Sequence, residues 1–185
     1  MAHLSRRRIV SAIILGPITS HAIAQRTATN AHCSGGWKIT GYYTATDTEF
    51  SGESVDIEID GKGYIFPEDF LHWVRTDGWG LTHHGWYLGW NGGWRRGDAP
   101  LNARGQPLVV GGVAVDPKVI PLGTRLRMPD LPAPWNAREY IANDIGGGVI
   151  GKWLDVYCGD GPDKRQEAIR LTGSHYTVCV GAAAA

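Results

Sequence analysis

The sequence predicts an all-β protein built as a small closed β-barrel. Short segments rich in β-branched and aromatic residues recur along the chain. Only two stretches are bounded by the residues typical of helix starts and ends. The 26 glycines among 185 residues suit tight connections between such strands. This pattern favours a closed barrel over a sandwich or an α/β sheet.

Six segments are expected to be strands, each bounded by Gly, Pro, Asn or Asp. The first begins at Trp37, after a small and polar stretch that is expected to be irregular. The expected ranges are 37–43, 108–115, 124–128, 139–143, 153–158 and 176–180.

Two short helices are expected beside the strands. Pro67 begins the first, with Trp73 on its apolar face, and Pro162 begins the second, which ends before Gly173.

An aromatic-rich insertion occupies roughly residues 47–106. Its tryptophans follow neither a helical nor a strand period, and glycines and polar residues separate them. Rings on such a backbone suit stacking against sugar faces, but they could equally form a small core for the insertion itself. The tryptophans concerned are Trp73, Trp79, Trp86, Trp90 and Trp94.

The N-terminus predicts export. Three arginines at 6–8 precede an apolar run at 9–18, and Ala22-Ile23-Ala24 fits a cleavage site, so residues 1–24 are expected to be a signal peptide. The run is shorter than the roughly 20 apolar residues that span a bilayer. The mature protein is therefore expected to be periplasmic or secreted, without a membrane anchor.

The remaining chain is expected to form one domain over residues 25–181, with a disordered tail at 182–185, and to be a monomer. The leader would take three of the 18 basic residues and none of the 18 acidic ones, leaving a slight negative balance. Such a balance argues against nucleic acid and anionic membranes as partners.

Three cysteines in an oxidising compartment allow one disulfide. We expect Cys158 to pair with Cys179, and Cys33 with Cys179 is the competing pairing. The three lack C-x-x-C spacing, and adjacent histidines at 83 and 84 would point to opposite faces of a strand. No metal and no cofactor are expected.

Three aspartates in glycine- or proline-rich frames, Asp116, Asp144 and Asp155, are the candidate acids. Asp116 precedes a proline, where a turn role is favoured. Alternation in the segment 153–158 puts Asp155 on one face with Trp153 and Tyr157, and the intervening residues in the core. Partial burial between rings would raise the pKa of Asp155 and suit it to general acid catalysis.

These motifs resemble those of a known family. V-D-P with I-P-L-G at 115–123, D-x-G-G at 144–147 and D-V-Y at 155–157 are similar to the three-aspartate (3D) domain of peptidoglycan lytic transglycosylases. T-G-Y-Y at 40–43 resembles the first strand of the membrane-bound lytic transglycosylase A group.

The resemblance implies a six-stranded double-psi β-barrel that cleaves the MurNAc-GlcNAc bond of peptidoglycan glycan strands and leaves a 1,6-anhydro ring. It implies that Asp155 is the catalytic acid, that Asp144 orients the site or tunes its pKa, and that Asp116 ties a loop. The residues expected in the substrate-binding site are Thr40, Tyr43, Asp116, Trp153 and Tyr157.

Two positions depart from the motif: Ile145 replaces a threonine and Ile150 a lysine, which bears on substrate preference more than on the chemistry. Two other functions remain open. One is a non-catalytic glycan-binding module like the barrels of expansins and barwin-type proteins. The other is an endoglucanase-type hydrolase that uses Asp144 and Asp155 as an acid and base pair.

Overall fold

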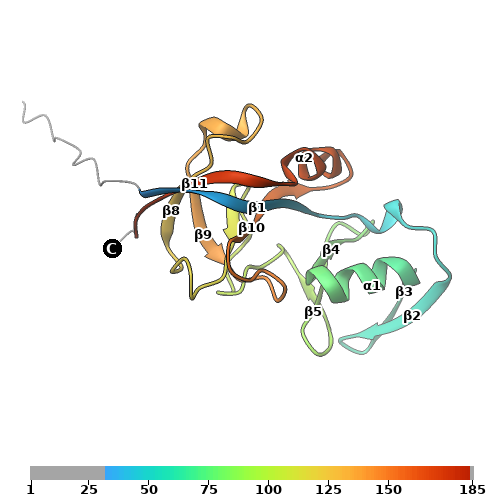
Figure 1. Ribbon diagram of the computed structural model, residues 1–185. Coiled ribbons are helices and arrows are strands. Elements are labelled where there is room, and N and C mark those ends of the chain that lie inside the picture. The colour runs from blue at the N-terminus through green and yellow to red at the C-terminus, as the bar shows by residue number, and fades with distance from the viewer. Residues whose placement is uncertain (1–31, 184–185) are drawn as a thin grey trace, which may run out of the picture.

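The protein consists of a closed six-stranded barrel with a smaller lobe beside it, in a computed structural model that describes residues 32–183 (Figure 1). The expected six-stranded barrel is confirmed. Its strands are β1 (His32–Thr44), β7 (Gly112–Ala114), β8 (Thr124–Arg127), β9 (Tyr140–Asp144), β10 (Trp153–Asp160) and β11 (Gly173–Ala183).

The strands close in the order β1-β10-β7-β9-β8-β11. The pairs β1/β10 and β7/β9 are parallel, and the other neighbours are antiparallel. In the β1/β10 pair Thr40 lies opposite Asp155 and Lys38 lies opposite Trp153. The first strand of the barrel therefore supplies neighbours for the candidate acid, which is more than 100 residues away in the chain.

The barrel core follows the alternation expected for β10. Leu154, Val156 and Cys158 are buried in it, at 0%, 0% and 2% exposure. Helix α2 (Asp163–Leu171) covers the barrel beside β1. A Cβ on Gly41 would lie 2.6 Å from the Cα of Ala168, so glycine is required where this helix crosses β1.

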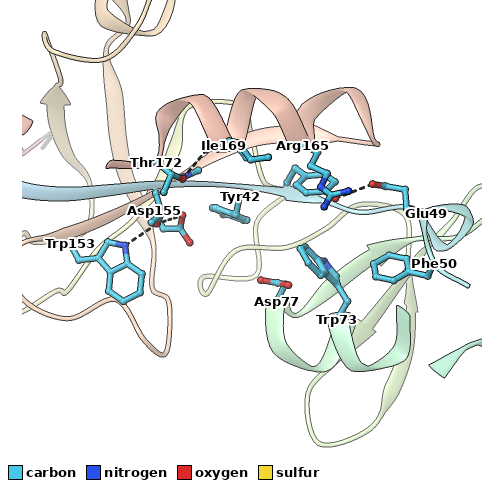
Figure 2. A pocket seen from close by; sticks show the side chains of 14 residues that line it. Tyr42, Glu49, Phe50, Trp73, Asp77, Trp153, Asp155, Arg165, Ile169 and Thr172 are labelled. Atoms are coloured by element: carbon cyan, nitrogen blue, oxygen red, sulfur yellow. Dashed lines mark hydrogen bonds between the residues drawn. The ribbon is translucent and has the colours of Figure 1, made fainter. Parts of the chain in front are cut away.

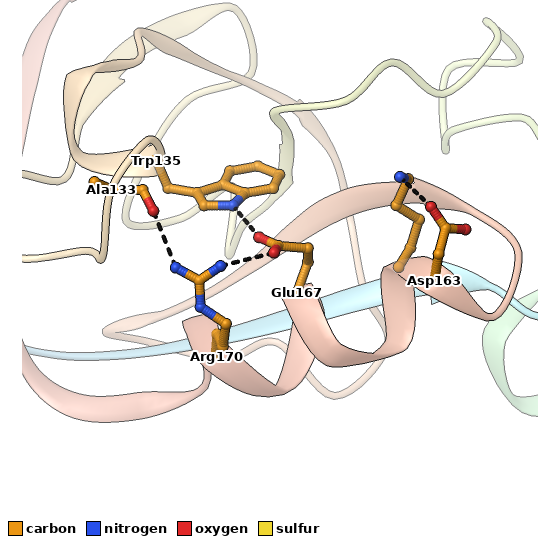
Figure 3. A network of polar contacts seen from close by, with 6 residues as sticks. Ala133, Trp135, Asp163, Glu167 and Arg170 are labelled. Atoms are coloured by element: carbon orange, nitrogen blue, oxygen red, sulfur yellow. Dashed lines mark hydrogen bonds and ion pairs between the residues drawn. The ribbon is translucent and has the colours of Figure 1, made fainter.

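Polar contacts fix the outer side of α2 (Figure 3). The indole of Trp135, in the short 3₁₀ helix Trp135–Ala137, donates to Glu167 at 2.7 Å. Arg170 donates to the same carboxylate at 2.7 Å and to the carbonyl of Ala133 at 3.0 Å. These bonds hold the helix against the loop between β8 and β9.

The insertion forms a lobe with its own core. Helix α1 begins directly after Pro67, as expected, and packs on two small sheets. The core holds Phe66, Phe70, Trp86 and Leu88, all buried. The elements are the 3₁₀ helix η1 (Asp47–Glu49), β2 (Ser54–Ile59), β3 (Lys62–Pro67), α1 (Glu68–Asp77), β4 (Trp79–Leu81), β5 (Tyr87–Trp90) and β6 (Trp94–Gly97).

The five strands of the lobe were not expected from the sequence, although the alternation in β2 and the Asp60-Gly61 turn after it are signals of a β-hairpin. Trp79 and Trp86 are 6% and 5% exposed, so these two tryptophans are core residues of the insertion and do not offer their rings to a sugar. Trp73, Trp90 and Trp94 are only partly buried.

The expected disulfide between Cys158 and Cys179 is wrong. Cys33 pairs with Cys179, which lies directly opposite it on β11, and Cys158 is a buried free thiol. The reason is side-chain parity. Val178 points into the core, so Cys179 points out, whereas Cys158 points in.

The ends of the chain differ from the expectations in part. The predicted signal peptide lies outside the described residues. Strand β1 begins at His32, earlier than expected, and β11 runs to Ala183, two residues beyond the expected end of the domain. Within residues 32–183, no helix is long and apolar enough to cross a membrane.

Candidate active site

A cavity of about 590 Å³ lies between the barrel and the lobe (Figure 2). The barrel side comes from β1, β10 and α2, and the lobe side from α1 and the segment around η1. The lining residues are Thr40, Gly41, Tyr42, Tyr43, Glu49, Phe50, Trp73, Asp77, Trp153, Asp155, Arg165, Ala168, Ile169 and Thr172.

Asp155 projects from β10 into this cavity and is held by a short chain of hydrogen bonds. Thr40 donates its hydroxyl to Oδ1 of Asp155 at 2.7 Å. The indole N–H of Trp153 donates to the same hydroxyl oxygen at 2.8 Å. Thr40 thus acts as donor to the carboxyl group and acceptor from the ring, which fixes the orientation of Asp155.

The surroundings of Asp155 favour its protonated form. Burial raises the pKa of this carboxyl above its ordinary value, and the negative charge of Asp144 raises it further. The hydrogen bond from Thr40 and the ammonium of Lys38 act in the opposite direction. A carboxyl group in this balance can hold a proton and release it, as a general acid requires.

Asp144 does not line the cavity. Its Oδ1 accepts from the backbone N–H groups of Ala103, at 2.7 Å, and Ile145, at 2.8 Å, and its Oδ2 accepts from the hydroxyl of Tyr42 at 3.2 Å. Burial, together with the charges of Asp144 and Asp155, raises the pKa of Tyr42 well above its usual range, so its hydroxyl stays neutral. Asp144 therefore acts on the cavity indirectly, through the hydrogen bond it accepts from Tyr42 and through the effect of its negative charge on Asp155.

Asp116 lies outside the cavity and joins two loops. It accepts from the backbone N–H of Gly151 and of Lys118, both at 2.9 Å. These bonds hold its pKa below the ordinary value, so it remains a carboxylate. The contact to Gly151 pins the glycine-rich loop that leads into β10.

The two tyrosines expected to contact sugar are placed differently. Tyr43 lines the cavity, and its hydroxyl donates to Glu49 at 2.9 Å. Tyr157 is only 2% exposed, and its hydroxyl bonds with Thr44 at 2.8 Å and with Asp160. The ring of Tyr42 covers it, with centroids 5.1 Å apart, so Tyr157 supports the wall and does not flank Asp155.

Sequence reasoning missed the acid on the lobe side. Asp77 ends α1 and lines the cavity one helical turn after Trp73, so the two share a face of the helix. Burial, followed by the charge of Asp155, raises the pKa of Asp77 to about 6. The i, i+4 spacing was visible in the sequence, but nothing there indicated which face the helix turns toward the barrel.

No group of three or more potential metal ligands occurs among the described residues. His83 bonds to buried Asp47 through its ring at 2.6 Å and through its backbone N–H at 2.9 Å. This contact ties the loop after β4 to η1.

Comparison with known proteins supports the family resemblance. Residues 111–178 match the model of the 3D domain family, which confirms the resemblance over this stretch. The similarity to the 3D domain thus spans β7 to β10, α2 and the first part of β11. Comparison with curated proteins gave no match.

Solved structures of lytic transglycosylases share the fold. E. coli MltA with bound chitohexaose superposes with a TM-score of 0.61 at 17% identity, over 81% of this chain and 73% of that chain. Another E. coli MltA structure gives 0.57 at 18% identity, over 82% and 73%. The monoclinic form of Neisseria gonorrhoeae MltA gives 0.53 at 14%, over 83% and 74%. The barrel is thus a double-psi β-barrel, as expected.

Proposed function

We propose that the protein is a peptidoglycan lytic transglycosylase that cleaves the β-1,4 bond between N-acetylmuramic acid and N-acetylglucosamine. The observation that carries this proposal is Asp155, a partly buried carboxyl group with a raised pKa on the wall of a cavity of about 590 Å³. The shared fold with MltA, one structure of which holds chitohexaose, supports a glycan as the occupant.

The first step is proton donation. Oδ1 of Asp155 accepts from Thr40, so the proton is carried on Oδ2, for which the described part of the chain offers no hydrogen-bond partner. Asp155 donates this proton to the glycosidic oxygen. The bond from C1 of the muramic acid to that oxygen breaks, the glucosamine leaves with a free 4-hydroxyl, and positive charge develops at C1 and the ring oxygen.

The second step uses the same carboxyl group as a base. Asp155, now ionised, takes the proton from the C6 hydroxyl of the muramic acid while O6 bonds to C1. The product is a 1,6-anhydro ring, and Asp155 regains its proton. Because the nucleophile is part of the substrate, proximity replaces the second carboxylate and the water of a hydrolase.

The other residues have positioning roles in this proposal. Thr40 and Trp153 orient Asp155, and burial together with the charge of Asp144 raises the pKa of Asp155. The ring of Trp73 offers an apolar surface to a sugar. Its indole N–H is buried and has no partner in residues 32–183, so the face of the ring is what the cavity offers to a sugar.

A hydrolase is the second candidate, because Asp77 gives the cavity another carboxyl group. With a pKa raised to about 6, Asp77 would act as base toward a water while Asp155 acts as acid. This version replaces the pair of Asp144 and Asp155, since Asp144 does not line the cavity. A glycan-binding module without catalysis is the third.

One digestion separates the three functions. Purified peptidoglycan is incubated with the mature protein, and the released fragments are analysed by mass spectrometry. We expect anhydromuropeptides, each lighter by one water than the product of hydrolysis. Reducing ends would instead show hydrolysis, and sedimentation with the sacculi without release would show a binding module. The assignment also requires export, so the mature N-terminus of the periplasmic or secreted protein should begin after residue 24.

A further inference from the structure

A second cavity of about 590 Å³ lies on the lobe and shares no lining residue with the candidate active site. We call it the lobe groove. It is bounded on one side by β3 and on the other by the residues around the turn before β5 and by β6. Its lining residues are Lys62, Gly63, Tyr64, Ile65, His83, His84, Trp86 and Arg96.

The strand that borders the groove has an open edge. β3 pairs only with β2 in the described residues, and a two-residue turn joins them at Asp60 and Gly61, both with positive φ. Such a turn closes with a hydrogen-bonded pair, here Ile59 and Lys62. Alternation then directs the N–H and C=O groups of Gly63 and Ile65 away from β2.

These outward groups make no backbone hydrogen bond to another segment of the chain between residues 32 and 183. Both residues line the groove, and the side chain of Ile65 is 62% exposed. An open edge of this kind is a template for one more extended strand.

The side chains of the groove are cationic and aromatic. Lys62 lies over the ring of Tyr64 at 5.2 Å, and Arg96 lies over the ring of Trp86 at 5.3 Å. The ring of His84 stacks on that of Trp86, with their centroids 5.9 Å apart.

The acidic groups of β2 lie on the other face of the hairpin from Lys62. Asp56 and Glu58 share a face with Ile65 and Gly63, and a carboxylate oxygen of Asp56 lies 3.2 Å from the position of a Cβ on Gly63. Lys62 and Tyr64 share the face of the buried Ile57 and Ile59. Asp47 is buried and bonded to His83. A strand added at the open edge would therefore meet carboxylates on one face and, on the other, Lys62 together with Arg96 above Trp86.

We propose that the lobe groove binds an extended acidic peptide, which adds as a strand to the edge of β3 and sets its carboxylates against Lys62 and Arg96. Backbone pairing with Gly63 and Ile65 would supply affinity, and charge complementarity would supply selectivity. Carboxylates on alternate residues of such a strand lie about 7 Å apart on one face, which allows two of them to reach the two cations. The proposal does not depend on the chemistry at Asp155.

The test uses labelled pentapeptides and fluorescence anisotropy with the mature protein. One peptide alternates glutamate and valine, a second alternates lysine and valine, and a third is the acidic peptide with alternate backbone nitrogens methylated. We expect the acidic peptide to bind at least about tenfold more tightly than either of the others, because each loses charge-assisted or backbone hydrogen bonds.

Arg95 provides a matched control for Arg96. The two are neighbours on β6, but Arg95 lies over Trp79 at 4.6 Å, outside the groove. Arg96→Gln should weaken binding of the acidic peptide about tenfold, and Arg95→Gln by less than about twofold. Equal effects of the two changes would refute the charge assignment.

Ile65→Pro tests the strand edge, because it removes an N–H that β2 does not use. It should abolish binding with a small change in melting temperature, whereas Ile65→Thr should retain binding. The methylated peptide tests the same edge on the unaltered protein if Ile65→Pro does not fold. Undiminished binding of the methylated peptide, or inorganic polyphosphate binding as tightly as the acidic peptide, would overturn the proposal.

Discussion

The two walls of the candidate active site are built in different ways. On the barrel wall, Thr40, Trp153 and Asp155 are fixed by the parallel register of β1 and β10 and by hydrogen bonds among themselves. On the lobe wall, Trp73 and Asp77 project from a single helix. The barrel wall thus links its three side chains by hydrogen bonds through Thr40, whereas the lobe wall depends on helix packing and on ring contacts from Trp73 to Tyr43 and Phe50.

Several contacts join the two units. The segment after β1 meets β4 through a bridge from Thr46 to Leu81 and a bond from Leu81 N to the carbonyl of Ala45. The hydroxyl of Tyr87 on β5 donates to Asp160, that of Tyr43 donates to Glu49, and Ala103 N donates to Asp144. Catalytic groups must be held to well within 1 Å, whereas an apolar contact to a sugar tolerates larger displacements. In the proposed function, the hydrogen-bonded barrel wall therefore carries the chemistry and the lobe wall positions the sugar.

The largest expected effect comes from Asp155→Asn. An amide cannot donate and reclaim the proton, so turnover of peptidoglycan should fall by at least about a thousandfold. The change is nearly isosteric, and the melting temperature should stay within a few degrees. Asp77→Asn is the matched control on the lobe wall and should retain most activity. A larger loss of turnover in Asp77→Asn than in Asp155→Asn would instead support the hydrolase.

Removing the disulfide tests the stability of the barrel. In the chain-entropy view, a link between residues 146 positions apart stabilises the fold by roughly 5 kcal/mol. Cys33→Ser should therefore lower the melting temperature by about 10–20 °C in calorimetry. Cys158→Ala removes a thiol that forms no disulfide and should cost much less. Equal losses for both variants would contradict the pairing.

Two tryptophan substitutions should separate the walls kinetically. Trp153→Phe removes the donor to Thr40 and loosens Asp155, so kcat should fall about tenfold with little change in KM. Trp73→Phe replaces the indole by a smaller aromatic ring and so reduces the apolar surface on the lobe side, and KM should rise by several fold with kcat nearly unchanged. A fall in kcat for both would show that the lobe wall also shapes the chemistry.

The pH dependence of activity should show the effect of the negative charge of Asp144, which lies behind the barrel wall. Asp155 must be protonated to donate, so activity is lost as the pH rises through its raised pKa. The negative charge of Asp144 contributes to that elevation, so Asp144→Asn should move the alkaline limb to lower pH. Asp116→Asn is the control, because Asp116 carries the same charge but lies outside the cavity. The alkaline limb of this variant should stay where it is in the unaltered protein.

The smallest effect concerns Asp77 and stability. Its pKa is raised to about 6 in the folded protein, so the folded state binds the proton more tightly than the unfolded chain. The resulting stabilisation is complete below the ordinary value of 3.8 and is lost as the pH rises to about 6. Asp77→Asn should flatten the pH dependence of urea unfolding between these limits. An unchanged slope would mean that Asp77 titrates normally.

The sequence by itself determined much of the barrel. Alternation of apolar and polar residues, with the Gly, Pro, Asn and Asp residues between segments, located its six strands and both helices. Alternation within β10 placed Leu154 and Val156 in the core and Asp155 on the other face. The spacing of the aspartate motifs was enough to indicate a similarity to the 3D domain, whose model matches residues 111–178. These features depend on residues close together in the chain, where backbone geometry fixes which side chains share a face.

Other features were decided only by the tertiary structure. Barrel closure set Cys33 opposite Cys179, placed Tyr42 over Tyr157, and brought Thr40 against Asp155. Packing of the lobe turned Asp77 into the cavity. Each of these contacts joins segments far apart in the chain, and local pattern carries no information about which distant faces meet. Closure of the barrel and docking of the lobe supply that information, because burying the apolar faces of both units permits few arrangements.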